Sequence, residues 1–231
     1  MAKIGLVGGL GPESTVEYYQ SIISGYQEKL GSNKVLPHLV INSINMYQVF
    51  AYIDDDNTQG LSDYLTKAVN ELEASGVDFA AISANTPHIV FDQVNRQTRL
   101  PLISIVEETV KDVRQANLNR VGLIGTRFTM ANDFFKKPFR DVGIDVIVPN
   151  EKDQVLIHEK TVDELENGIV KEETKETFLE IICRMEEEDG IEGLILGCTE
   201  HPMLIKPTDT SIKQFNTTAI HVSALVERLT R

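Results

Sequence analysis

The sequence has little of several features that define common protein classes. It contains two cysteines and no tryptophan in 231 residues, and its 22 lysines and arginines face 35 aspartates and glutamates. Two cysteines in a chain of this length do not make a disulfide framework. The formal net charge of −13 argues against a general binder of nucleic-acid backbones, because such surfaces need clustered lysine and arginine.

Long apolar runs are missing as well. The N-terminal stretch MAKIGLVGGLGPES has one lysine and a short apolar run that glycines interrupt, unlike the continuous apolar region of a signal peptide. No run approaches the ~20 apolar residues that are needed to cross a bilayer. We therefore expect a cytoplasmic protein that binds neither membranes nor nucleic acid.

The residues that are present predict an α/β fold. With 42% hydrophobic and 25% charged residues, the chain is long enough for one large domain or two smaller ones. Short β-branched runs alternate with helical patterns, and several runs are continuously apolar, as in parallel strands covered on both faces. The predicted strands are KIGLVGG (3–9), PHLVINSI (37–44), FAAISA (79–84), PLISIV (101–106), RVGLIGT (120–126), DVIVP (145–149) and GLILG (193–197).

An internal repeat indicates two related halves. KIGLVGGLGPESTVEYY (3–19) is echoed by RVGLIGTRFTMANDFF (120–135) at an offset of 117 residues (122 − 5 = 117), and GVDFAAISAN is echoed by GIEGLILGCT at an offset of 114 (198 − 84 = 114). We predict pseudo-symmetric, mainly parallel α/β domains: residues 1–105 with 213–231, which include a C-terminal amphipathic helix, and residues 106–212. Ligands of open parallel sheets bind at the carboxyl ends of strands. An active site between the halves is therefore expected, with Ala84 and Cys198 on opposite sides of one ligand.

Cys198 is the main candidate for chemistry. It follows a buried strand and precedes a helix start, where backbone N–H groups are expected to lower its pKa and favour the thiolate. Cys183 lies inside a helical run and is expected to be inert. His88 and His201 are candidates either for tuning a thiolate or for a structural hydrogen bond. One cysteine and one histidine make at most half a zinc site, so no metal is predicted.

The glycine-rich loop GGLGPEST does not fit a dinucleotide fingerprint. The third glycine position is Ser14, Pro12 interrupts the turn, and no acidic residue follows the next strand at SIN (43–45). A backbone nest for a substrate carboxylate at a helix N-terminus fits the loop better. We therefore expect no nicotinamide cofactor.

Four of these elements together resemble the aspartate/glutamate racemase family: KIGLVGGLGPESTVEYY, SANTPH, LIGTRFTMANDFF and GLILGCTE. The resemblance covers nearly the whole chain. It implies two pseudo-symmetric domains with the active site between them, often a homodimer, and no pyridoxal phosphate or other cofactor. It also implies that one cysteine removes the α-proton of an amino acid while a second, on the opposite face, returns one. The second cysteine corresponds to Cys198, and the first falls on Ala84.

The alanine leaves three readings open, because two-base racemisation needs a proton carrier on each face. In the first reading, the chain is a racemase acting on aspartate, glutamate or a similar amino acid, with Ser83, a water or another neighbour opposite Cys198. It can instead be a single-thiol decarboxylase or cis-trans isomerase of the same superfamily. It can also be a non-catalytic binding protein for an amino acid or dicarboxylate.

The resemblance also supplies a set of expected substrate-binding residues. They are Gly9, Leu10, Gln48, Asn85, Thr86, Thr126, Thr199 and Glu200. The counter-charge for a side-chain carboxylate is not evident from the sequence. The polar and basic candidates for that role are Asn45, Gln48, Arg127, Lys152 and Lys160.

Overall fold

A computed structural model describes residues 2–231. The chain forms two compact units, one made of residues up to Glu108 together with Thr218–Arg231, and the other of Thr109–Thr217. Each unit contains one four-stranded, fully parallel sheet. The predicted α/β class with parallel sheets is therefore confirmed. No helix in the described residues is long and apolar enough to cross a membrane.

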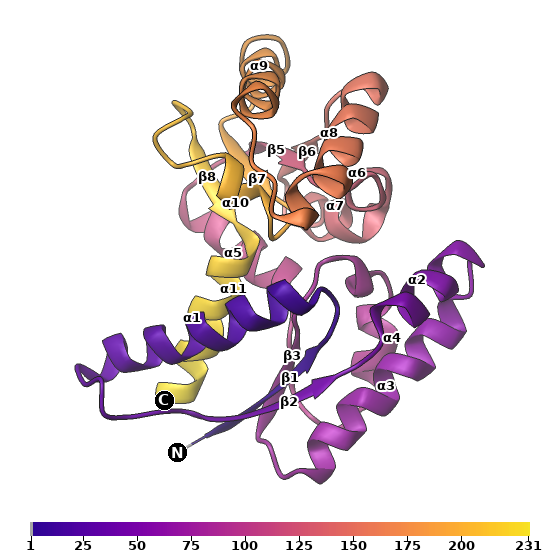
Figure 1. The fold of residues 1–231 in the computed structure, drawn as a ribbon, viewed down its shortest axis with the longest axis vertical. Helices are drawn as coiled ribbons and strands as arrows, with labels where there is room; N and C mark the ends of the chain where they lie inside the picture. Colours follow the sequence, from indigo (N-terminus) through magenta and orange to yellow (C-terminus); the bar gives the residue numbers. More distant parts are fainter. Residues whose placement is uncertain (1) are drawn as a thin grey trace. The chain divides into compact units, whose positions relative to one another are not determined.

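The first unit has the strand order β2-β1-β3-β4. Its strands are β1 (Lys3–Gly8), β2 (His38–Ser43), β3 (Phe79–Ile82) and β4 (Leu102–Ile103), and its helices are α1 (Pro12–Leu30), α2 (Met46–Asp54), α3 (Thr58–Ala74), η1 (Thr86–Val90), α4 (Phe91–Gln97) and α11 (Thr217–Thr230). Figure 1 shows α1 and α11 on one face of this sheet and α3 on the other. Both faces of the strands are thus covered, which explains their continuously apolar sequences.

The second unit repeats that order as β6-β5-β7-β8. Its strands are β5 (Arg120–Ile124), β6 (Asp145–Ile147), β7 (Gly193–Leu196) and β8 (Lys213–Asn216), and its helices are α6 (Arg127–Ala131), α7 (Asp133–Arg140), α8 (Glu151–Asp163), η2 (Leu165–Asn167), α9 (Glu172–Asp189) and α10 (His201–Leu204). Helix α5 (Ile105–Gln115) begins in the first unit's residues and ends in the second's. Residues of α8 and α9 form one apolar cluster with β5 and β7.

Equivalent hydrogen bonds support the repeat. The N–H of Ser83 donates to Val7 O at 3.0 Å, and the N–H of Gly197 donates to Ile124 O at 2.8 Å. Each bond joins the end of the third strand to the end of the first, with the offsets of 114 and 117 residues seen in the sequence. At the other end of the same strands, Asp78 N–H donates to Lys3 O and Glu192 N–H donates to Arg120 O.

The division of the chain differs from the predicted boundaries by three residues within α5, where the second unit begins at Thr109 and not at residue 106, and by a whole strand at the end of the second unit. The predicted second half ended at residue 212, whereas the second unit extends to Thr217. The difference is β8, which pairs with β7 in parallel and therefore belongs to the second sheet. The sequence KQFN of this strand carries a single buried apolar residue, Phe215, and so lacked the apolar run by which the other strands were predicted.

Candidate active site

Cys198 lies two residues beyond the end of β7, at the carboxyl edge of the second sheet. The preceding Gly197 packs closely against β5, because a Cβ added there would lie 2.9 Å from Leu123 Cδ1 and 3.0 Å from Ile124 O. This glycine lets the end of β7 approach β5 and holds the following cysteine beside the β5–α6 loop. The Cys198 side chain is buried, and the residue is 9% exposed.

The thiol of Cys198 is hydrogen-bonded to a carboxylate. Its Sγ donates to Glu200 Oε2 at 2.9 Å, and Thr199 Oγ1 donates to the same oxygen at 2.6 Å. Burial is the main cause that raises the pKa of Cys198 well above its usual value, and the negative charge of Glu200 adds to it. The expectation of a lowered pKa was wrong, because loss of hydration and a neighbouring carboxylate outweigh the backbone N–H groups near the sulfur. The resting group is a protonated thiol.

A second carboxylate, Glu166, is exposed on η2, a segment that packs close to the Cys198 loop. Segment η2 contacts α10, and Leu165 belongs to the same apolar cluster as Leu204. The pKa of Glu166 is raised, first by loss of hydration and then by the charge of Glu200. Glu166 in turn contributes to the raised pKa of Cys198. No sequence pattern singled out Glu166, because it lies 32 residues before the thiol in an acidic stretch.

His201 has a structural role. Its Nε2 lies 3.0 Å from Thr161 Oγ1, and Thr161 Oγ1 donates its own proton to Ile157 O. The ring must therefore donate from Nε2, which leaves Nδ1 unprotonated. Burial lowers the pKa of His201 to about 3, so the neutral ring anchors α10 to α8 rather than exchanging protons with Cys198.

Ala84 occupies the equivalent strand end in the first unit. Its carbonyl lies 2.8 Å from His88 Nδ1, while the N–H of Ile105 donates to His88 Nε2 at 3.3 Å. This arrangement fixes a neutral His88 that donates from Nδ1, and burial lowers its pKa to about 4. His88 is thus a structural residue that ties η1 to the start of α5.

The structure argues against Ser83 as the proton carrier that replaces a first thiol. Its side chain is fully buried, and its hydroxyl donates to Val7 O at 3.0 Å within the sheet. The Ser83 carbonyl accepts a bond from Ser14 Oγ, also at 3.0 Å. Ser83 therefore holds β1, β3 and α1 together.

The glycine-rich loop after β1 is shaped by its own contacts. Gly9 has φ of +75°, and a Cβ there would lie 2.3 Å from Ile44 O, so only glycine fits. Its N–H donates to Thr15 Oγ1 at 2.8 Å. Gly9 therefore does not supply a donor to the predicted carboxylate nest, which would depend on Leu10 and the first turn of α1.

The remaining expected residues lie at the two carboxyl edges. In the second unit, Thr126 caps α6 by accepting from Thr129 N–H. It lies two residues after Ile124, as Cys198 lies two residues after Leu196, the strand partner of Ile124. In the first unit, Asn85 is buried, Thr86 is half-buried, and Gln48 is exposed in the first turn of α2. The structure thus brings Thr126, Cys198, Thr199 and Glu200 to one edge of one sheet. It brings Gly9, Leu10, Ala84, Asn85 and Thr86 to the corresponding edge of the other.

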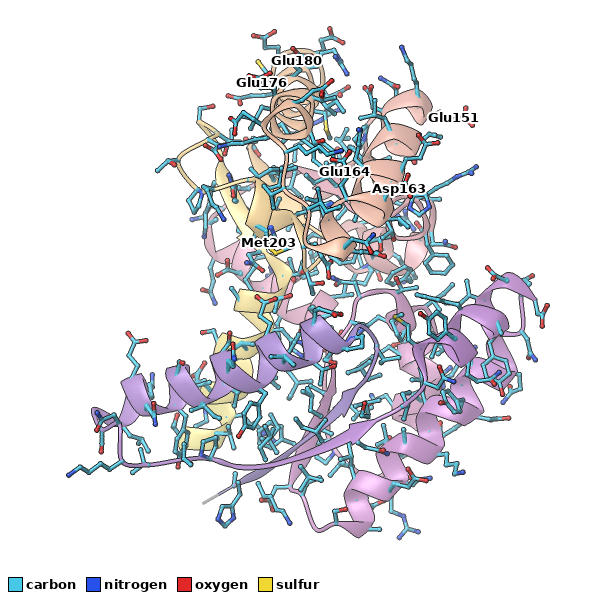
Figure 2. All side chains as sticks on the ribbon, in the orientation of Figure 1. Glu151, Asp163, Glu164, Glu176, Glu180 and Met203 are labelled. Carbon is cyan, nitrogen blue, oxygen red and sulfur yellow. The ribbon has the colours of Figure 1, made fainter. Side chains whose placement is uncertain are left out.

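One of the candidate counter-charges, Lys160, is already bound by another carboxylate. Lys160 binds Glu164 at 2.8 Å, and Lys171 binds the same carboxylate at 3.0 Å. Thr174 Oγ1 completes this group, and the three donors lower the pKa of Glu164 to about 2. Figure 2 shows Glu164 between α8 and α9. Lys160 is therefore a structural ion-pair partner, while Arg127 stays exposed at the start of α6.

A metal centre is not supported in residues 2–231, where no three histidine, cysteine, aspartate or glutamate side chains are grouped to hold an ion. The fold and the site define a two-unit parallel α/β protein with a buried, protonated thiol at one strand end. A methyl group stands at the equivalent strand end of the other unit.

Comparison with known proteins agrees with this description. The family model for Asp/Glu/Hydantoin racemases matches residues 7–225. A solved structure of an aspartate racemase homologue from Pyrococcus horikoshii is 35% identical, with a TM-score of 0.90 over 100% of both chains. That of a candidate Asp/Glu racemase from Yersinia pestis is 30% identical, with a TM-score of 0.94 over the same coverage. The chain belongs to the Asp/Glu/Hydantoin racemase family.

Curated relatives are matched over part of their length. A broad specificity amino-acid racemase from Bacillus subtilis is 29% identical over 147 residues, which cover 62% of this chain and 63% of that protein. A glutamate racemase from Aquifex aeolicus is 24% identical, over 66% of this chain and 58% of its own. Their substrates are therefore a starting point for a proposal about this chain.

Proposed function

We propose that the chain is an amino-acid racemase-type isomerase in which Cys198 moves the α-proton. The observation that carries the proposal is the Cys198 thiol at the carboxyl edge of its sheet, hydrogen-bonded to Glu200, whose carboxylate also accepts from Thr199. Family membership supports the same reaction type. Racemisation needs a group that can break the α C–H bond and hold the proton, and a thiol does both.

In this proposal, the protein supplies a proton carrier on only one face of the α-carbon. The thiolate of Cys198 accepts the α-proton, the electron pair remains on the α-carbon, and the thiol returns a proton to the same face. With Ala84 at the equivalent strand end of the other unit, inversion depends on water at the opposite face. We therefore expect α-proton exchange with solvent to be faster than racemisation, and the reaction to need no pyridoxal phosphate, nicotinamide or metal.

The raised pKa of Cys198 sets the pH dependence. A thiol whose pKa is raised holds its proton at neutral pH, so only a small fraction is thiolate and able to accept a proton. The exchange rate is expected to rise with pH through neutrality, in proportion to that fraction. Glu200 receives the thiol hydrogen bond and positions the sulfur.

The test is incubation of the chain with L- and D-amino acids in D2O, followed by the NMR signal of the α-proton. Loss of the signal without added cofactor and in the presence of EDTA supports the proposal. An unchanged α-proton signal for every amino acid tested would favour the alternative of a non-catalytic binding protein. Consumption of a substituted malonate or a maleate-like double bond would favour the single-thiol decarboxylase or isomerase.

A homodimer in the cytoplasm remains part of the proposal, and sedimentation would test the dimer.

A further inference from the structure

Strand β2 forms an edge of the first sheet, and its outer side is open. The strand is six residues long and pairs with β1 on one side only. Outside that ladder, the backbone groups of His38–Ser43 form no hydrogen bond with any other residue from 2 to 231. Open edges pair readily with another strand, and proteins usually block them with short strands, charged side chains or proline.

The other three sheet edges are blocked in these ways. Strand β4 has two residues, β6 has three and begins with Asp145, and β8 has four and begins with Lys213. Strand β2 lies instead in the longest uncharged stretch of the chain, residues 35–53, although charged residues make up 25% of the sequence. It is therefore the longest and least charged edge of the two sheets.

Helix α1 packs over β2 and carries a second row of apolar residues beside its core-facing one. The core-facing row forms one apolar cluster with Leu39 of β2. The second row, called the outer stripe below, follows the 3–4 spacing by which helices pair. It consists of Val16 (54% exposed), Tyr19 (45%), the half-buried Ile23 and Leu30 (44%).

The outer stripe faces the side of β2 because the other side of α1 is occupied by α11. A Cβ added to Gly25 would lie 3.1 Å from Val226 Cγ2 of α11. Helix α11 in turn lies over β3, where Arg228 is 5.8 Å from the centre of the Phe79 ring. Since β2 and β3 are on opposite sides of β1, the outer stripe and the open edge belong to one face of the first unit.

A second copy of this chain fits that face. Two β2 strands related by a two-fold axis run antiparallel, so each supplies the donors and acceptors that the other needs. The same axis brings the outer stripe against its own copy. The formal charge of −13 makes two copies repel over most of their surface, whereas the outer stripe and β2 contain no charged residue.

We propose that the β2 edge and the outer stripe of α1 join two copies of the chain into a dimer with one continuous sheet. Its strand order is β4-β3-β1-β2 in one copy, followed by β2-β1-β3-β4 in the other. The inference rests on the homodimer of the proposed function and supplies its interface. It does not depend on the reaction at Cys198.

Sedimentation of the parent chain and of Tyr19→Glu tests the interface. The parent should sediment as a dimer, and Tyr19→Glu should raise the dissociation constant at least about 100-fold, because the two-fold axis sets two carboxylates against each other in an apolar contact. Val142→Glu is the matched control, since Val142 is 41% exposed in the second unit, and it should leave the dimer unchanged. Circular dichroism checks that both variants are folded.

The outcomes separate the interface from the rest of the proposed function. A dimer that Tyr19→Glu leaves intact would overturn the interface and leave the homodimer standing. A monomeric parent would overturn both and leave this face to a different partner. The α-proton exchange test of Cys198 is independent of either result.

Hydrogen exchange distinguishes strand pairing from helix contacts alone. The outward amides of His38–Ser43 should exchange at least about 10-fold more slowly in the dimer than in the parent diluted to a monomer. Strand β6, the equivalent edge of the second sheet, is the internal reference and should exchange equally in both. Equal exchange of β2 in dimer and monomer would overturn the continuous sheet.

Discussion

The hydrogen bond from Cys198 to Glu200 allows a direct test of the thiol's environment. Replacing Glu200 with glutamine removes the negative charge 2.9 Å from the sulfur and keeps the side chain's length. Burial of Cys198, the largest cause of its raised pKa, stays in place. The change should therefore lower the pKa of the thiol without restoring its ordinary value.

The magnitude follows from the bond that is lost. A hydrogen bond to a charged group is worth ~1.5–3 kcal/mol, and roughly 1.4 kcal/mol corresponds to a tenfold change in the thiolate fraction. Glu166 and the loss of hydration remain, so we take the lower end of that range. Alkylation of Cys198 by iodoacetamide at a fixed neutral pH should then be about 10-fold faster in Glu200→Gln.

The assay requires a background with one thiol. Cys183 is exposed and would also react, although the charge of Glu187 raises its pKa. Cys183→Ser removes this reaction, and Glu180→Gln in the same background controls for the loss of one negative charge. Alkylation of Cys198 that is equally fast or slower after Glu200→Gln would show that Glu200 does not hold the thiol protonated.

Three further predictions concern the other unit and the stability of the chain. Ala84→Cys should raise the rate of racemisation toward the rate of solvent exchange, by up to ~100-fold if it places a proton carrier opposite Cys198. Ala84→Ser is the control. An unchanged ratio of racemisation to exchange would contradict the symmetric arrangement. Tyr18→Phe should lower the free energy of unfolding by about 1–3 kcal/mol, because the Tyr18 hydroxyl donates to the buried His221 Nδ1 at 2.8 Å. Urea titration measures this, with Tyr19→Phe at the exposed neighbouring position as a control that should have little effect. Equal effects of the two substitutions would refute the role of the bond. Glu164→Gln should lower the melting temperature at neutral pH by on the order of 5 °C. Because the pKa of Glu164 is depressed, its contribution to stability is lost as the pH falls from 4.5 toward about 2. The melting temperatures of the variant and the parent should therefore converge over that range. A difference in melting temperature that stays constant would contradict this.

The strands and the repeat were readable from the sequence because both depend on local patterns. Continuous apolar runs mark strands that are covered on both faces, and the offsets of 114 and 117 residues reappear as equivalent hydrogen bonds at Ser83 and Gly197. Strand β8 was missed for the same reason, since Lys213–Asn216 has no apolar run and is defined by its pairing with β7.

The electrostatics of the site depend on the fold and could not be read in the same way. The position of Cys198 at a strand end suggested a lowered pKa. The sequence does not show that the sulfur is buried or that the Glu200 carboxylate accepts a hydrogen bond from the thiol. The packing of η2, which carries Glu166, on α10 is also a contact of the folded chain that no local pattern predicts. His201 likewise looked like a partner of Cys198 by spacing, yet its ring is bound to Thr161 on α8.

The central claim is that Cys198 carries the α-proton, and solvent exchange at the α-carbon tests it most directly. The α-proton of the preferred amino acid should be replaced by deuterium in D2O with the parent chain and with Cys183→Ser. It should be replaced at least ~100-fold more slowly with Cys198→Ser, the scale on which a positioned acid or base acts. Exchange by a folded Cys198→Ser variant at the rate of the parent would contradict the account.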